Sequence, residues 1–251
     1  MDNQLLDTVS IREIVNKNPG SISVFEKLKI DYCCNGKFTF EEACQRAKVS
    51  KESVAKLLEE TVSDNPLALI RTHLWPLDFL ASFIVHNHHA YVKRVTPEIL
   101  FLTGKVSKAH SARHPEVEAI KTQFEILSDE LEKHMYKEEA ILFPAVTGLV
   151  KRSNNLNFEF EQIADAEFRL MYPIEVMEAE HESAGKCLAK IRELSDDYTL
   201  PEEACNSFEL LYQRLREFED DLHTHIHLEN NILFPKALEL EASLLKNPFT
   251  Y

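Results

Sequence analysis

The sequence predicts an all-α protein, in which a four-helix bundle follows a small helical domain. Only 5 glycines occur among 251 residues, and alternating runs of β-branched residues are few. The 10 prolines fall mostly at the ends of segments, where they punctuate helices. From about residue 69 onward, apolar residues recur at the spacing of long amphipathic helices. These three observations together predict the fold class.

Residues 1–62 are predicted to form the small domain. A capped helix, a Pro-Gly turn and a second helix lead to a loop that carries Cys33 and Cys34, and two more helical segments follow. Residues 63–72 include the Ser, Asp, Asn and Pro that are typical of a linker.

The bundle is predicted to occupy residues 73–251. Its four long helices are expected at roughly 73–109, with a bend at Pro97, and at 115–151, 160–195 and 202–246. Short breaks separate the helices, so neighbours along the chain are expected to be antiparallel.

A repeated motif marks the second and fourth helices. "HMYKEEAILFP" begins at His134 and "HIHLENNILFP" begins at His225, and both read H-x-x-x-E followed by I-L-F-P. Upstream of each His, apolar residues hold the same five offsets, −3, −7, −10, −14 and −17. Each His therefore lies on the buried stripe of its helix, and Glu138 and Glu229 share that stripe one turn later.

The other two helices each supply a histidine. His181 lies on the apolar stripe of the third helix, and the first helix carries "HNHHAYV". The spacing from His181 to His225 is 44 residues, and that from His89 to His134 is 45. The bundle thus reads as a duplicated helical hairpin with a His on the first helix and H-x-x-x-E on the second.

Six polar groups that converge in a core predict metal binding. A single H-x-x-x-E would more simply be a Glu paired with its own His or with a Lys, but two copies in register plus two further histidines favour cations. Imidazole and carboxylate donors without cysteine suit iron or manganese better than a structural zinc site. Glu138 and Glu229 are expected to bridge two ions, and we interpret the centre as diiron. Glu180, beside His181, is the candidate gate or proton relay and the one catalytic assignment, whereas Glu139 and Glu182 are expected to be solvated or outer acids.

Composition limits the partners and the compartment. The formal net charge of −14 disfavours nucleic acid and an anionic membrane surface. No apolar segment approaches the ~20 residues needed to span a bilayer, and the start lacks a secretory signal, so a cytoplasmic protein is expected. The odd count of 5 cysteines indicates reduced thiols. A homodimer stays open.

The thiols fall into two kinds. Cys33 and Cys34 are the candidate cofactor-binding pair, which could hold iron transiently or exchange redox equivalents near Lys37. The alternative is that they are two small apolar residues after a helix. The remaining three, Cys44, Cys187 and Cys205, are expected to pack helices.

The two motifs, preceded by "IDYCCNGKFTFEEAC", resemble those of the RIC (repair of iron centres) diiron proteins, also called the ScdA/YtfE family, whose bundle is similar to the hemerythrin HHE domain. The resemblance covers almost the whole chain. It implies two non-heme iron ions with oxo and carboxylate bridges on Glu138 and Glu229, and terminal histidines His134, His181, His225 and one on the first helix. The family register favours His89 there, whereas apolar periodicity favours His88; we prefer His89. Where the family has "CCGGK" this chain has Asn35 after the cysteines, and Asn tolerates a left-handed backbone.

The resemblance implies that the protein repairs iron–sulfur clusters damaged by oxidative or nitrosative stress, with iron supply as the leading mechanism and damaged or apo iron–sulfur proteins as partners. A diiron nitric oxide reductase is the alternative enzyme, and enzymatic activity is left uncertain. A carrier or sensor that binds nitric oxide or oxygen, like a hemerythrin, is the third reading.

Overall fold

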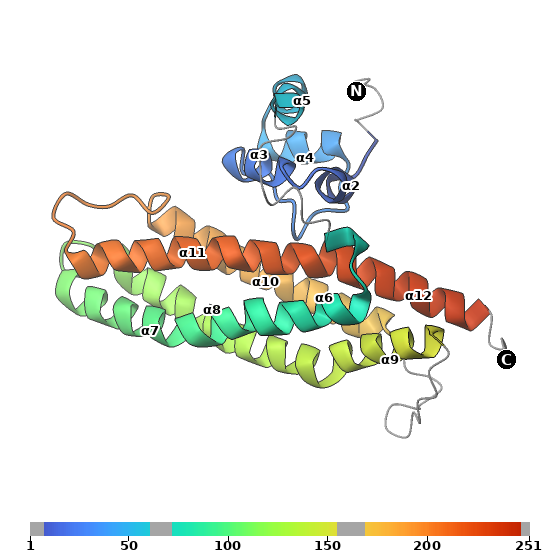
Figure 1. The fold of residues 1–251 in the computed structure, drawn as a ribbon. Coiled ribbons are helices and arrows are strands. Elements are labelled where there is room, and N and C mark those ends of the chain that lie inside the picture. The colour runs from blue at the N-terminus through green and yellow to red at the C-terminus, as the bar shows by residue number, and fades with distance from the viewer. Residues whose placement is uncertain (1–7, 61–71, 155–168, 247–251) are drawn as a thin grey trace. The chain divides into compact units, whose positions relative to one another are not determined.

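The computed structural model describes residues 8–60, 72–154 and 169–246, and every regular element within them is a helix (Figure 1). The all-α prediction is confirmed. By its contacts the chain forms two compact units, of which the first joins Met1–Pro76 to Ile226–Lys236 and the second joins Leu77–His225 to Ala237–Tyr251. The domain boundaries at 1–62, 63–72 and 73–251 stay predictions, and all of the expected linker except Thr72 lies outside the described residues.

Between residues 8 and 76, the described part of the first unit contains four short helices and one 3-10 turn, and two of the helices begin with a complete capping box. Ser10 and Glu13 exchange side-chain and backbone hydrogen bonds, and Thr39 does the same with Glu42. Each box satisfies backbone N–H groups that a helix start leaves without partners. The elements are α2 (Ile11–Lys17), α3 (Ser21–Lys27), α4 (Phe40–Ala47), α5 (Lys51–Glu60) and η2 (Thr72–Leu74).

The four predicted long helices are present, and three of them are interrupted by a π-helical turn. The first helix begins at Leu77 rather than at residue 73 and continues through Pro97; its departure from α geometry comes earlier, at 85–89. The fourth begins at Asn206 rather than at residue 202. In order they are α6 (Leu77–Ile84), η3 (Val85–His89) and α7 (Ala90–His110); α8 (Glu116–Lys137), η4 (Glu138–Leu142) and α9 (Phe143–Ser153); α10 (Met171–Leu194); and α11 (Asn206–Leu228), η5 (Glu229–Leu233) and α12 (Phe234–Lys246).

The apolar stripes predicted for the second and fourth helices are confirmed as core. In the second unit α8 packs against α7 and α10 (Figure 1). The Phe218 ring of α11 meets Phe124 of α8 with a centroid distance of 5.2 Å. Burying each such ring contributes about 1.5–3 kcal/mol. All ten stripe positions are buried: Val117, Ile120, Phe124, Leu127, Leu131, Phe208, Leu211, Leu215, Phe218 and Leu222.

None of the helices in the described part of the chain combines the length and the apolar character that crossing a bilayer requires.

Candidate metal centre

Three predicted ligands lie at the edge of a π-helical turn. His89 is the last residue of η3, Glu138 is the first of η4, and Glu229 is the first of η5. The backbone N–H of Phe143 donates to the Glu138 carbonyl, and that of Phe234 donates to the Glu229 carbonyl, which are hydrogen bonds five residues apart. Such turns are rare and occur often at functional sites.

The repeated I-L-F-P sequence gives a physical reason for two of these turns. Pro144 and Pro235 have no backbone N–H, so neither can donate to the carbonyl four residues earlier. For Pro235 that carbonyl belongs to Asn231, and it accepts a hydrogen bond of 2.9 Å from the Asn16 side chain within the first unit. The proline in each motif therefore removes one helical hydrogen bond close to a predicted ligand.

The six predicted donors form two groups that share two members. One group contains His89 and His225, the other contains His134 and His181, and Glu138 and Glu229 belong to both. Within each group the donor atoms lie within 4.8 Å of one another. Two pairs of histidines with two common carboxylates are the arrangement expected of a two-ion centre with bridging glutamates.

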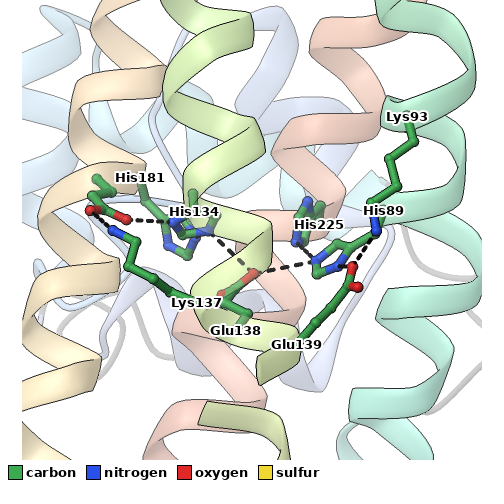
Figure 2. Close-up of polar contacts among 9 residues, drawn as sticks. His89, Lys93, His134, Lys137, Glu138, Glu139, His181 and His225 are labelled. Carbon is green, nitrogen blue, oxygen red and sulfur yellow. Dashed lines mark hydrogen bonds and ion pairs between the residues drawn. The ribbon is translucent and has the colours of Figure 1, made fainter. Parts of the chain in front are cut away.

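Figure 2 shows Glu138 between the two histidine pairs. Its Oε2 lies 3.3 Å from the Nε2 of His89 and also 3.3 Å from the Nε2 of His134. The Nε2 atoms of His89 and His225 are 3.3 Å apart, and those of His134 and His181 are 3.0 Å apart. All four imidazoles thus present the same nitrogen to the centre.

Burial makes this cluster costly unless cations or protons compensate it. Each of the six residues is at most 2% exposed. Imidazoles and carboxylates removed from water to this degree carry a large desolvation penalty, which metal coordination offsets. The donor set and its burial fit an iron-binding site.

A carboxylate on α10 contacts the outer nitrogen of His134. Glu180 Oε2 lies 2.9 Å from His134 Nδ1, and Lys137 pairs with the other Glu180 oxygen. The hydrogen bond with His134, aided by Lys137, lowers the pKa of Glu180 to about 2 against the effect of burial. Because an ionised carboxylate can only accept, His134 must donate from Nδ1, which leaves the Nε2 lone pair facing the centre.

The same arrangement recurs at the other histidine pair. Glu139 Oε1 lies 2.8 Å from His89 Nδ1 and 2.7 Å from Lys93 Nζ. Burial tends to raise the pKa of Glu139, but the hydrogen bonds from Lys93 and His89 outweigh it and lower the pKa. The prediction for Glu139 is a solvated or outer acid, and the sequence motifs assign no role to either lysine. The spacing of Lys93 and Lys137, one turn after a histidine, was the available signal.

The remaining histidines lie outside the two groups. His88 Nδ1 pairs with Asp221 at 3.0 Å, so it faces α11 and belongs to neither group. His227 is buried in the first unit, where its ring lies 5.8 Å from that of Tyr32. Burial, with a smaller effect of Arg12, lowers the pKa of His227 to about 4.

The cysteine assignments are only partly confirmed. Cys33 and Cys34 lie in the loop between α3 and α4, and their role in cofactor binding stays a prediction. Cys44 is buried as expected, but Cys205 is exposed, so its assignment as a packing residue is wrong. Cys205 lies just before α11, because this helix begins later than predicted. Its Sγ is 3.2 Å from His110 Nε2.

Asn35 contributes hydrogen bonds to this loop. It is not among the described residues with positive φ, so it does not use the left-handed backbone that Asn tolerates. Its Nδ2 donates instead to Asp31 Oδ2 at 2.5 Å. An amide that holds the loop in this way needs no unusual backbone.

Family comparison agrees with the geometry. Residues 81–237 match the model of the hemerythrin HHE cation binding domain. The chain belongs to this family. Residues 7–62 match a second model, ScdA_N, described as a domain of unknown function.

Full-length relatives extend the match to both parts of the chain. An iron-sulfur cluster repair protein YtfE of Musicola paradisiaca is 33% identical over 233 residues, which is 93% of this chain and 97% of the relative. Proteins of the same name from Yersinia pseudotuberculosis and Yersinia pestis are 32% identical over 224 residues, covering 89% of this chain and 93% of the relative. The family resemblance seen in the motifs is confirmed.

Proposed function

We propose that this protein is a diiron protein that repairs iron–sulfur clusters damaged by oxidative or nitrosative stress, and that it does so by supplying iron. The observation that carries the proposal is the sharing of Glu138 and Glu229 by two buried histidine pairs. The names of the full-length relatives, all of them iron–sulfur cluster repair proteins, support the same function. Damaged or apo iron–sulfur proteins are the proposed recipients. Nitric oxide binding, a homodimer and a cytoplasmic location stay predictions.

The distances between donors support two ions. Two imidazole nitrogens bound to one ion at about 2.1 Å, at angles of 90–110°, lie about 3.0–3.4 Å apart. The separations of 3.0 Å for His134 and His181 and 3.3 Å for His89 and His225 fall in that range. These four histidines would be the terminal ligands, and Glu138 and Glu229 would be the bridging ligands. Iron held there would be the cargo for cluster rebuilding.

The outer carboxylates connect the buried donors to the surface. The side chain of His89 is fully buried, that of Glu139 is 31% exposed, and that of Lys93 is 53% exposed. Glu180 has the corresponding position beside His134 that Glu139 has beside His89, and Lys137 lies outside Glu180. We assign Glu180 a positioning role, in which it fixes the tautomer of His134. The gate or proton relay inferred from sequence stays a prediction.

Iron transfer tests the proposal. The protein is loaded with ⁵⁷Fe²⁺ without air and mixed with an apo iron–sulfur protein, a cysteine desulfurase and cysteine, and the appearance of cluster absorption is followed. We expect faster assembly than with the same concentration of free Fe²⁺ plus a metal-free bystander protein. Assembly no faster than with free Fe²⁺ would exclude iron supply.

Matched variants connect transfer to the centre. Glu138→Ala removes a shared carboxylate, whereas Glu182→Ala removes an acid of α10 whose side chain is 61% exposed and pairs with Lys186. We expect the first variant to hold less iron and to lose the acceleration, and the second to behave like the parent. Equal transfer by both variants would place the donated iron elsewhere in the chain.

A further inference from the structure

Three potential ligands gather in the loop between α3 and α4 of the first unit. Asp31, Cys33 and Cys34 place one carboxylate oxygen and two sulfurs within 4.8 Å of one another. The two Sγ atoms are 3.8 Å apart, and Cys33 Sγ is 3.5 Å from Asp31 Oδ1. None of these three residues belongs to the histidine and glutamate groups of the bundle.

The separations match those around a tetrahedral cation. With cation–sulfur distances of about 2.3 Å and a cation–oxygen distance of about 2.0–2.2 Å, tetrahedral angles place sulfur about 3.8 Å from sulfur and about 3.5–3.7 Å from oxygen. The separation between the two sulfurs and that between Cys33 Sγ and Asp31 Oδ1 are therefore already those that coordination requires. Two thiolates select thiophilic divalent ions over magnesium or calcium.

Hydrogen bonds hold the loop in this shape from two sides. Asp31 Oδ1 accepts from the backbone N–H of Cys33 at 3.1 Å and from that of Cys34 at 2.9 Å. Within the same unit, Asn231 Nδ2 donates to the Tyr32 carbonyl at 2.8 Å, and Asn230 Nδ2 donates to the Cys33 carbonyl at 3.2 Å. A ligand set fixed in advance loses little conformational entropy when it binds.

Cation binding by this pair would release the protons of the two thiols, because thiolate rather than thiol is the metal ligand. The exchange balances as one divalent cation plus two thiols giving one dithiolate complex plus two protons.

We propose that Asp31, Cys33 and Cys34 form a second cation site, which binds one thiophilic divalent ion such as Co²⁺, Zn²⁺ or Fe²⁺ and leaves a fourth position open. The carboxylate and the two thiolates supply two soft donors and one hard donor. An open position is typical of sites that exchange ligands rather than of closed structural sites. The site does not depend on the function proposed for the bundle.

Cobalt titration tests the site in the full-length apo protein under argon, with a thiol-free reductant present. Sulfur ligation gives a thiolate-to-cobalt charge-transfer absorption in the near ultraviolet, which nitrogen and oxygen ligands in the bundle cannot give. We expect this band to saturate at one ion per chain and to be accompanied by the release of two protons per ion, read with an indicator in dilute buffer. Absence of the band would overturn the proposal whether or not the bundle binds cobalt.

Variants assign the band to its ligands. Cys33→Ser with Cys34→Ser should abolish it, and Cys205→Ser, which removes an exposed thiol outside the loop, should leave it unchanged. Asp31→Asn keeps an oxygen that can accept the loop hydrogen bonds, so the loop should still fold and both thiols remain. We expect the affinity of this variant for cobalt to fall at least tenfold, as is typical when a ligand or its support is lost. A band that survives the double serine variant, or an Asp31→Asn variant with parental affinity, would refute the three-residue site.

Discussion

Replacing Glu180 with glutamine would remove the negative charge that faces the outer nitrogen of His134 while preserving the size of the side chain. The carboxylate lies 2.9 Å from His134 Nδ1 and holds the tautomer that presents Nε2 to the centre. Glutamine is neutral and can turn its NH₂ group toward the ring, so this selection is weakened. We expect iron to bind less tightly at the His134 and His181 pair.

The expected loss follows from the exposure of the carboxylate. Removing an outer partner of a metal-bound histidine typically weakens metal affinity 10–100-fold, or about 1.4–2.7 kcal/mol. The Glu180 side chain is 33% exposed, and water screens its charge. We therefore expect the lower end of that range, about tenfold.

Anaerobic competition between the protein and a coloured Fe²⁺ chelator measures the change. The Glu180→Gln variant should show one weakened iron and one of parental affinity, and Glu139→Gln should show the same pattern through His89. Glu182→Gln on the same helix is the control, because its partner is the surface residue Lys186. Iron affinities in the Glu180 variant equal to those of the control would refute the reasoning.

Three further predictions concern stability. A Cβ on Gly36 would clash with Asn231 Oδ1, so Gly36→Ala should lower the free energy of unfolding by about 1–3 kcal/mol. Gly104 lies in a helix, and its new Cβ would have nothing within 4 Å beyond its chain neighbours and the helix's own backbone, so Gly104→Ala should raise the free energy of unfolding by about 0.5–1 kcal/mol. Urea denaturation showing the same sign for both variants would contradict this. Tyr198→Phe removes an O–H that donates at 2.8 Å to the buried Glu219 carboxylate, and it should lower the free energy of unfolding by about 1.5–3 kcal/mol in the same assay. A parental urea midpoint would show that this hydrogen bond contributes nothing to stability. Saturating the apo protein with Fe²⁺ at a thousandfold excess over Kd should add about 4 kcal/mol for each ion bound. Calorimetry would record this as a Tm rise of about 8–16 °C per ion, and an unshifted Tm would disprove it.

Local periodicity sufficed to predict that the two H-x-x-x-E motifs converge. The spacing of an α-helix fixes which residues share a face, and the apolar stripes before His134 and His225 marked that face. The choice between His88 and His89 shows where the method fails. The turn at Val85–His89 adds one residue, so Ile84 is in phase with His89 rather than with His88. A constant helical period carried across that turn therefore places His88, rather than His89, on the apolar face.

Contacts between distant helices could not be predicted. Glu139 directly follows a ligand and Glu180 directly precedes one, and neighbouring helical residues point about 100° apart. Spacing along one helix therefore predicts no partner for either carboxylate. Their partners, His89 and His134, come from helices 50 and 46 residues away in sequence. The gathering of Asp31 with Cys33 and Cys34 was missed for another reason: it depends on an irregular loop whose shape no periodicity describes.

The three π-helical turns limit how this bundle can be recombined. Each turn carries an extra residue, so deleting one residue there would rotate all later side chains by about 100° around the axis. A chimera that joins half of this bundle to half of a homologue should therefore be spliced within the uninterrupted α segments, where both parents keep the same phase. A junction inside Glu138–Leu142 or Glu229–Leu233 that lost the extra residue would rotate every later side chain out of phase with the carboxylate before it.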